Sequence, residues 1–414
     1  MTFLYSLNIL FFIFITIFKV YYLSRYFRLG FLNPISIPFI ISLPVEIMKV
    51  FGGPMFMLTD GLFNVWFNYA LFVTNIELAI KFIVIYFTIK FSERNSFIKY
   101  KLINIFKPYN PKKQRMIIVA VFFLFIFFVM FILLSKDFGL INWLMSPRTG
   151  YQLHRTGKGQ WYALSLLFLS TSYTIMMLYT KKVSNLFFVF TIYVLLVFLL
   201  GSKGFIFSYV IFFIIVLWLR KSKYFKQAFL IVPPIGFGLM MLNFNLLEFI
   251  EIVSYFDYYI NSAMYFESYF KNEIDLFYGK IWLTDFYKYM PRAIFPDKPF
   301  VYGFLYVNEF FYPGQAEKTN TPAFGGPMPA FADFGFIGVI LFAIFDLGLI
   351  FKTILLYILY KNIHLQSIRN NSNNFYLFVW ILAPSFMNFF GTIYSIILFI
   401  FIVKIISIFN RIKI

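Results

Sequence analysis

Stretches of about 20 predominantly apolar residues recur along the whole chain, and they limit its fold more than any other feature. Each stretch can cross the roughly 30 Å hydrocarbon layer of a membrane as an α-helix whose backbone groups bond to one another. Only 13% of the residues are charged, compared with roughly 25% in a soluble domain. The composition therefore excludes a single water-soluble core and predicts an all-α polytopic membrane protein.

Hydropathy predicts about eleven membrane-spanning helices, within a range of about ten to twelve. They lie at residues 3–18, 29–50, 61–89, 116–134, 160–180, 184–200, 204–219, 228–246, 331–358, 375–391 and 392–409. The first span follows Met1 and Thr2 with no basic leader and no small-residue cleavage site, so we expect it to be retained. We expect residues 1–414 to form a single integral membrane domain.

The basic residues predict the orientation of these spans. The segment 90–115 carries Lys90, Arg94, Lys99, Lys101, Lys107, Lys112, Lys113 and Arg115. The positive-inside rule makes this segment cytoplasmic, and alternation then places the amino terminus outside. The later basic clusters near residues 181, 220–226, 361–369 and 411–413 also fall inside. Topology thus accounts for the net charge of +19, and we expect no nucleic-acid partner.

One connection, residues 247–330, is much longer than the others and is predicted to lie outside the membrane between the eighth and ninth spans. Loops of this length are uncommon unless they are functional or disordered, and the many aromatic residues here argue against disorder. Its first part, 248–276, has a helical pattern that suits a helix lying at the membrane interface. Its second part, 291–329, is predicted to be irregular backbone packed over the spans.

The residue types restrict the chemistry. The chain has no cysteine, which excludes a disulfide framework and a thiolate site. Its two histidines, His154 and His364, fall in different loops without metal-ligand spacing. We therefore expect no cofactor and no metal, with catalysis by carboxylates and basic side chains.

Glu77, Glu46 and Asp346 are acidic residues well inside predicted spans. Glu77 and Lys81 are four residues apart on one helix face, so each can neutralise the other in the membrane. Pairing is the favoured interpretation, and a role in substrate binding is the alternative. Glu46 and Asp346 have no local partner and are expected to face polar cavities.

Basic residues on the predicted outer side are candidates for binding an anion. The turn Gly201-Ser202-Lys203-Gly204 joins two spans there and holds Lys203 near the depth of the headgroups; a snorkelling lysine in a tight turn is the alternative. Arg148 and Arg155, in the loop between the fourth and fifth spans, are better suited to phosphate because the guanidinium is a planar fork. Contact with anionic lipid headgroups explains either arginine equally well.

The most specific local feature is the run Tyr289-Met290-Pro291-Arg292-Ala293-Ile294-Phe295-Pro296-Asp297-Lys298-Pro299. Three prolines restrict the backbone around Arg292 and Lys298, which can hold two cationic side chains in set positions. A rigid surface turn is the alternative.

Three outer acids are candidates for a general base. Asp333 follows the Gly- and Pro-rich stretch 319–329 at the mouth of a helix, where it could cap that helix or act on a hydroxyl. Glu309 and Asp257 lie in the large loop and could fill the same chemical role.

Together these features resemble the Wzy-type O-antigen polymerases, a family of oligosaccharide repeat-unit polymerases of bacterial surface polysaccharide assembly. The resemblance rests on the number of spans, the large late outer loop, the Gly201–Gly204 turn, Pro291-Arg292 with Lys298-Pro299, and the Phe334-Gly335 and Ile337-Gly338 entry into the next helix. The turn departs from the expected pattern, with Lys203 in the place of an arginine. The fold implied by the resemblance is similar to that of membrane glycosyltransferases of the GT-C type.

The resemblance implies a metal-independent glycosyltransferase of the bacterial plasma (inner) membrane, with its catalytic loop on the extracytoplasmic side. It would polymerise repeat units linked to polyprenyl pyrophosphate into O-antigen or capsular polysaccharide. Arg292 with Lys298, together with Lys203, Arg148 or Arg155, would bind the pyrophosphate, and Asp333, Glu309 or Asp257 would be the base.

Other partners and other functions follow from the same pattern. Membrane lipids, a chain-length regulator and a flippase are the expected partners besides the substrate. An O-antigen ligase or another lipid-linked-sugar glycosyltransferase is the nearest alternative. A flippase is a weaker one, because transporters usually contain repeats and no internal repeat is visible in this chain.

Overall fold

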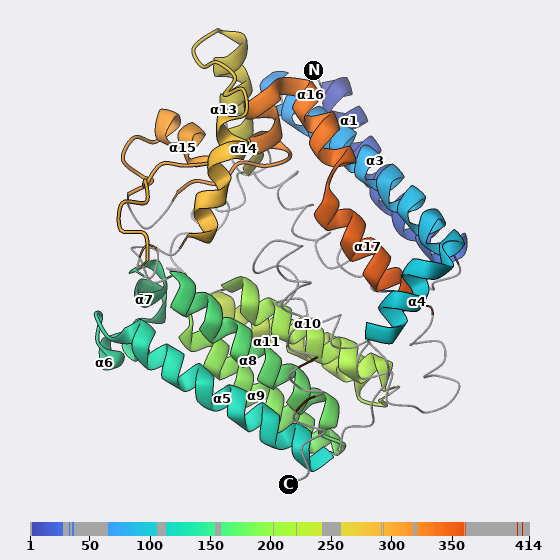
Figure 1. Ribbon diagram of the computed structural model, residues 1–414, viewed down its shortest axis with the longest axis vertical. Coiled ribbons are helices and arrows are strands. Elements are labelled where there is room, and N and C mark those ends of the chain that lie inside the picture. Colours follow the sequence, from blue (N-terminus) through green and yellow to red (C-terminus); the bar gives the residue numbers. More distant parts are fainter. Residues whose placement is uncertain are drawn as a thin grey trace. The chain divides into compact units, whose positions relative to one another are not determined.

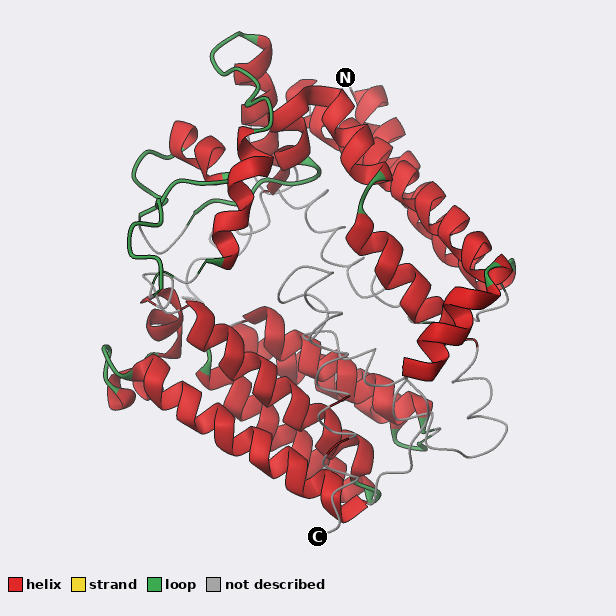
Figure 2. Cartoon of the chain, viewed as in Figure 1, coloured by secondary structure: helices red, strands yellow, loops and turns green. Residues whose placement is uncertain are grey.

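In the computed structural model, all secondary structure within the described residues is helical (Figure 2). The structure describes residues 2–27, 65–105, 113–153, 159–201, 203–220, 222–241, 258–290, 294–317 and 321–359, and the isolated residues 33, 35, 36, 292, 361, 404 and 408. The chain divides into two compact units. Unit 1 contains residues 1–91 and 247–353, and unit 2 contains residues 92–246 and 354–414.

Five helical stretches in the described ranges are long and apolar enough to cross a membrane. They are Leu4–Arg25, Val65–Arg94, Gln114–Ser135, Trp161–Tyr179 and Met328–Ile358. Two shorter apolar helices, Val183–Leu199 and Ser208–Trp218, lie at further predicted spans. The all-helical prediction is thus confirmed for the described residues. The count of eleven spans stays a prediction, because the predicted spans 29–50, 375–391 and 392–409 lie outside these residues except for five isolated positions.

Unit 1 is built from long helices that carry shorter ones from the large loop (Figure 1). Its elements are α1 (Thr2–Arg25), α3 (Val65–Arg94), α13 (Tyr258–Phe270), α14 (Lys280–Thr284), the 3-10 helix η3 (Asp285–Tyr289), α15 (Leu305–Phe311), α16 (Met328–Ile344) and α17 (Leu347–Leu359). The last turn of α3 and the second half of α17 belong to unit 2. Within its described residues, the predicted irregular stretch 291–329 contains the helix α15 and the first two residues of α16.

Helices α1 and α3 lie side by side and run parallel (Figure 1). Ring centroids of Tyr5 and Phe67 are 6.1 Å apart, and further along the helices those of Phe18 and Phe82 are 5.7 Å apart. The residue numbers therefore increase in the same direction along both helices. Parallel packing is what the first and third spans of an alternating topology require. Both helices end on a basic residue, Arg25 in α1 and Arg94 in α3, which agrees with a cytoplasmic end.

The predicted interfacial helix is present as α13, but its aromatic side chains pack inward. Phe270 stacks on Trp66 of α3 with centroids 5.2 Å apart, and Phe266 lies 4.6 Å from Phe331 of α16. Tyr265 and Phe266 are fully buried in one hydrophobic core with residues of α1, α3 and α16. The large loop is therefore anchored to the long helices of unit 1 by a shared aromatic core.

Unit 2 is a bundle in which helices α5, α8, α9, α10 and α11 lie side by side (Figure 1). Its helices are α4 (Ser96–Ile105), α5 (Lys113–Ser135), α6 (Leu140–Met145), α7 (Pro147–Leu153), α8 (Gly159–Tyr179), α9 (Val183–Leu199), α10 (Lys203–Leu219) and α11 (Phe225–Met241). Small hydroxyl residues let α8 pack closely on its neighbours, as where Ser172 Oγ donates to the carbonyl of Ala120 at 2.6 Å.

Contacts at one end of unit 2 join the segments predicted to be cytoplasmic. Arg220 follows α10 and donates to the carbonyls of Met177, Leu178 and Thr180 at the end of α8, at 2.6–2.7 Å. These carbonyls have no partner within the helix, and a cation is favourable at a helix carboxyl end. Lys361 pairs with Glu93 at 2.9 Å. These contacts agree with the order of loops that the charges predicted.

Candidate functional site

Arg292 and Lys298 hold each other's segments of backbone in the large loop. The guanidinium of Arg292 donates through Nη1 to the carbonyl of Lys298 and through Nη2 to that of Pro299, the latter at 3.2 Å. In return, Lys298 Nζ donates to the carbonyl of Met290 at 3.1 Å. Aromatic rings support both cations, with Arg292 4.0 Å from the centroid of Phe300. We call this arrangement the cation clip.

Within the described part of the chain, no acidic side chain balances the charge of the cation clip. Among the described residues, neither Arg292 nor Lys298 forms a salt bridge with a carboxylate. Burial lowers the pKa of the Lys298 ammonium, and the nearby Arg292 lowers it further. Two N–H groups of the Arg292 guanidinium donate to these carbonyls. The guanidinium has five N–H donors, so others remain for a ligand. The clip can therefore receive an anion such as a phosphate.

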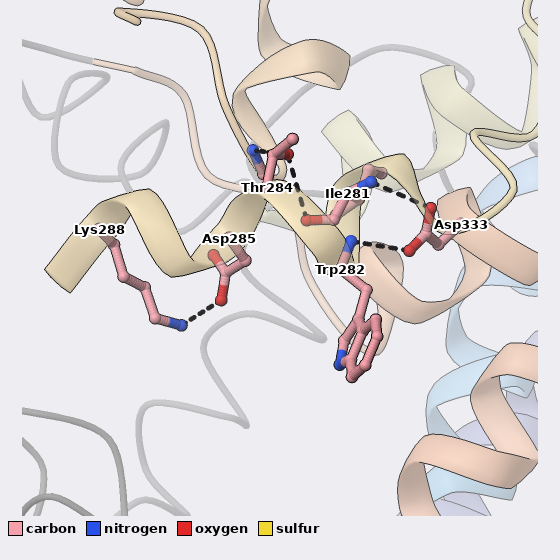
Figure 3. A network of polar contacts seen from close by, with 7 residues as sticks. Ile281, Trp282, Thr284, Asp285, Lys288 and Asp333 are labelled. Atoms are coloured by element: carbon pink, nitrogen blue, oxygen red, sulfur yellow. Dashed lines mark hydrogen bonds and ion pairs between the residues drawn. The ribbon is translucent and has the colours of Figure 1, made fainter. Parts of the chain in front are cut away.

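Asp333 is fully buried, and its carboxylate accepts backbone N–H groups from the start of α14 (Figure 3). Its Oδ1 accepts from Gly279 at 2.8 Å and from Ile281 at 3.1 Å, and its Oδ2 accepts from Trp282 at 2.8 Å. Asp333 thus caps a helix, as one interpretation predicted, but that helix is α14 and not its own. A negative charge is favourable at this position because the first amides of a helix have no partner within the helix.

The Phe-Gly pair forms a kink inside α16 directly after Asp333, and the glycine of the Ile-Gly pair packs closely against the backbone of the same helix. Phe334 and Gly335 leave helical geometry, and Gly335 has φ +63, a conformation that favours glycine. A Cβ on Gly338 would lie 2.2 Å from the carbonyl oxygen of Ala330, so only glycine fits there. Gly335 and Gly338 belong to the pairs on which the family resemblance rests, and backbone conformation and close backbone packing explain why glycine is needed at both.

The Gly-Gly pair before α16 joins the loop to two helices. Gly325 donates to the carbonyl of Tyr258 at 2.7 Å, and its own carbonyl accepts from Ser262 Oγ at 2.8 Å. Gly326 has φ +68, and a Cβ there would lie 2.2 Å from Thr74 Oγ1 of α3. The loop is therefore packed between α13 and α3 at this point.

Glu309 on α15 has one carboxylate oxygen in use and one without a partner. Its Oε1 accepts from the Gly314 amide at 2.7 Å, whereas Oε2 is buried and has no hydrogen-bond partner. Tyr265 Oη and Asn308 Oδ1 are also buried without a partner. Burial raises the pKa of Tyr265, with smaller contributions from Tyr269 and Asp333, so its hydroxyl remains a neutral donor. Asp257, the third predicted base, lies outside the described residues.

In unit 2, two of the predicted anion-binding segments pack against each other. A Cβ on Gly201, which has φ +69, would lie 2.2 Å from the carbonyl oxygen of Pro147, so the turn before α10 needs glycine. Arg148 directly follows Pro147, and its guanidinium lies 5.0 Å from the ring centroid of Tyr151. Lys203 begins α10 two residues after Gly201. Arg155 lies outside the described residues.

The charged residues predicted within spans give one confirmation and one correction. Glu77 and Lys81 form the predicted ion pair, at 2.6 Å. Asp346 does not lack a local partner, because its Oδ1 accepts the Leu349 amide at 2.8 Å. It caps α17 at a break that divides the predicted ninth span into two helices. Glu46, His154 and His364 lie outside the described residues.

Sequence reasoning missed the N–H groups that Asp333 binds. Gly279 precedes α14 with φ +93, which is the one local signal of a helix start. Nothing in the sequence connects that glycine to an aspartate more than fifty residues later. Within the described ranges, no three histidine, aspartate or glutamate side chains gather as metal ligands would.

The sequence is similar to those of two O-antigen polymerases. The chain is 31% identical over 240 residues to the O-antigen polymerase of Salmonella typhimurium and, equally, to the O-antigen polymerase of Salmonella typhi. The match covers 55% of this chain and 57% of each relative, so the chain spans a little over half the length of the relatives it matches. No family model matches the chain, and no solved structure matches it. The similarity confirms the resemblance that the motifs predicted.

Proposed function

We propose that this protein joins oligosaccharide repeat units carried on polyprenyl pyrophosphate into O-antigen or capsular polysaccharide. The observation that carries the proposal is the similarity to two O-antigen polymerases over 240 residues. The several apolar helices of span length agree with a multi-pass membrane enzyme. In this proposal the membrane is the bacterial inner membrane, and the large loop acts on its extracytoplasmic side.

The proposed reaction is a glycosyl transfer. A sugar hydroxyl at the non-reducing end of one lipid-linked unit attacks the anomeric carbon of the growing chain. The bond from that carbon to the polyprenyl pyrophosphate breaks, and the pyrophosphate leaves with the electron pair. The attacking hydroxyl gives its proton to a base. The protein must therefore supply cations for the leaving group and a carboxylate for the proton.

The cation clip is suited to the leaving group. Arg292 and Lys298 are held in place by backbone carbonyls and aromatic rings, so little reorganisation is needed when the charge develops. Neither cation is neutralised by a carboxylate among the described residues. Arg148, Arg155 and Lys203 remain further candidates for the pyrophosphate or for a lipid phosphate.

Among the candidate bases with described geometry, Glu309 is better suited than Asp333. Both oxygens of Asp333 already accept backbone amides, and its side chain is fully buried. Glu309 Oε2 has no hydrogen-bond partner, and neither do the buried Tyr265 hydroxyl and the side-chain carbonyl of Asn308. Sugar hydroxyls could supply these missing partners. Glu309 reaches a sugar only if the short helix α15 and the following turn shift on binding. Asp257 stays a candidate.

The test is the polysaccharide made by cells in which the chromosomal gene is replaced. Arg292→Ala should leave single repeat units on the surface lipid, with the protein present in the membrane in normal amount. Lys271→Ala is the matched control, because it removes an exposed cation of the same loop that pairs with Glu267. Wild-type chain lengths in the Arg292 variant would refute the role of the clip.

A strain that lacks the gene separates the alternative functions. A polymerase deletion should leave single repeat units on the surface lipid. Loss of a ligase would instead accumulate lipid-linked polymer, and loss of a flippase would stop lipid-linked units from reaching the outer face. The similarity to polymerases favours the first outcome.

A further inference from the structure

Large apolar side chains are exposed in the segment 278–294, which contains α14 and η3. Tyr278, Trp282 and Phe286 recur at every fourth residue and are 76%, 60% and 46% exposed. Leu283 and Ile294 are 61% and 69% exposed. We call these five residues the apolar ridge. Single exposed apolar residues are ordinary on proteins, whereas a contiguous group of them marks an interaction surface.

The ridge has a fixed orientation. On the side of α14 away from it, Ile281 is buried, and the buried Asp333 binds the amides of Gly279, Ile281 and Trp282. Farther along the loop, Gly303 donates to Thr284 Oγ1 at 2.9 Å. These contacts hold α14 against α16, so the exposed side chains cannot turn inward. Figure 3 shows the Trp282 side chain directed away from Asp333.

The point of attachment places the ridge near the end of a membrane span. Asp333 lies in the candidate span Met328–Ile358, five residues after its start. At 1.5 Å per residue, that is about 8 Å along the helix axis. Since Asp333 bonds directly to the start of α14, the ridge lies close to the level at which this span meets the headgroups. This step does not depend on which side of the membrane is outside.

The charges around the ridge favour an anionic surface. Between residues 278 and 300 there are four basic side chains, Lys280, Lys288, Arg292 and Lys298, and two acidic ones. Lys280 and Lys288 are both exposed; Lys288 pairs with Asp285, whereas Lys280 lies over the ring of Tyr306, 4.1 Å from its centroid. Aromatic side chains flanked by lysines are typical of segments that lie in the boundary between headgroups and acyl chains.

We propose that the apolar ridge docks into the headgroup region of the bilayer, with Lys280 against the phosphates of anionic phospholipids. The ridge is a membrane contact made by the loop itself, in addition to the spans. It holds the adjoining cation clip at the depth where the phosphates of any lipid-linked molecule lie. The docking does not rest on the proposed function, because it concerns where the loop lies and not what reaction it performs.

Because the chain contains no cysteine, a single introduced cysteine can be spin-labelled without further changes. The full chain with Leu283→Cys is labelled and reconstituted into vesicles of phosphatidylethanolamine and phosphatidylglycerol. Collision rates with oxygen, which concentrates in lipid, and with a water-soluble nickel chelate then report the label's surroundings. The control is Glu317→Cys, an exposed position in a polar turn of the same loop.

Docking predicts that oxygen reaches the label at residue 283 more readily than nickel does, with the reverse at residue 317. A water-exposed result at residue 283 overturns the proposal. Protection from both reagents also overturns it, because it means that protein covers the ridge. If the Leu283 variant is not recovered from membranes, Ile294→Cys gives the same reading. The measurement reports location only, so its failure is distinct from a failure of the proposed activity.

Discussion

Replacing Asp333 tests whether this residue organises the loop or performs chemistry. In Asp333→Ala, the amides of Gly279 and Ile281 lose their acceptor in a buried place. An unsatisfied buried N–H group costs about 1–3 kcal/mol, so the start of α14 should open more easily by about 2–6 kcal/mol. The Trp282 amide is only partly buried and can turn to water, so it adds less.

Asp333→Asn should have a smaller effect. The remaining side-chain oxygen can still accept from Gly279 and Ile281, while the new NH2 group faces the Trp282 amide where Oδ2 accepted at 2.8 Å. One lost bond of this kind corresponds to about 1–3 kcal/mol. The order of local stability should therefore be wild type, then Asp333→Asn, then Asp333→Ala.

Amide hydrogen exchange of the peptide that covers residues 277–284 measures this directly in the purified full chain. About 2 kcal/mol corresponds to roughly 30-fold faster exchange, because each 1.4 kcal/mol is a factor of ten. Polymer length in cells is measured in parallel, and Asp333→Asn should retain shortened polymer. Unchanged exchange in Asp333→Ala would refute the anchoring role. Unchanged exchange with complete loss of polymer in Asp333→Asn would make Asp333 the base.

Three further predictions follow from the geometry. Gly326→Ala places a Cβ 2.2 Å from Thr74 Oγ1 at φ +68, where an L residue costs roughly 1–2 kcal/mol, so thermal unfolding in detergent should occur at lower temperature. Thr74→Ala in the same chain should recover part of that loss, and no recovery would contradict the contact. Because burial and Arg292 lower the pKa of Lys298 from 10.5, its ammonium deprotonates below that pH, and pyrophosphate affinity measured by calorimetry should fall as the pH rises toward 10.5. Lys298→Met should remove this pH dependence, and a constant wild-type affinity would refute the role of the lysine. A reporter fused after residue 300 should lie outside the cytoplasm. A reporter found in the cytoplasm would contradict the proposed topology.

The long helices could be predicted from the sequence because span length and apolar composition are local properties. Helix α5 was expected at residues 116–134 and is observed as Lys113–Ser135, and α10 was expected at 204–219 and is observed as Lys203–Leu219. The break after Ile344 was missed because hydropathy does not report backbone dihedrals, and the apolar run continues across it. The acid at the break, Asp346, was the available signal, since aspartate is a strong helix amino-terminal cap.

The candidate site was predicted as a set of residue types, but not as an arrangement. Proline spacing indicated that Arg292 and Lys298 are held in place, and the structure adds the carbonyls that hold them. The partners of Asp333 could not be predicted, because they are backbone amides brought together only by the tertiary fold. The aromatic residues of α13 were placed at the membrane interface because their periodicity reports one apolar face. That face packs on α3 and α16, as the ring contacts of Phe270 and Phe266 show.

The most direct test of the proposed activity uses the purified full chain in vesicles that contain polyprenyl-pyrophosphate-linked repeat units and no other enzyme. Wild-type protein and Lys271→Ala should produce a ladder of longer lipid-linked chains, while Arg292→Ala should leave the units unjoined. Single units remaining with wild-type protein would contradict the assignment as a polymerase. An Arg292→Ala ladder as long as that of wild type would contradict the assignment of the cation clip.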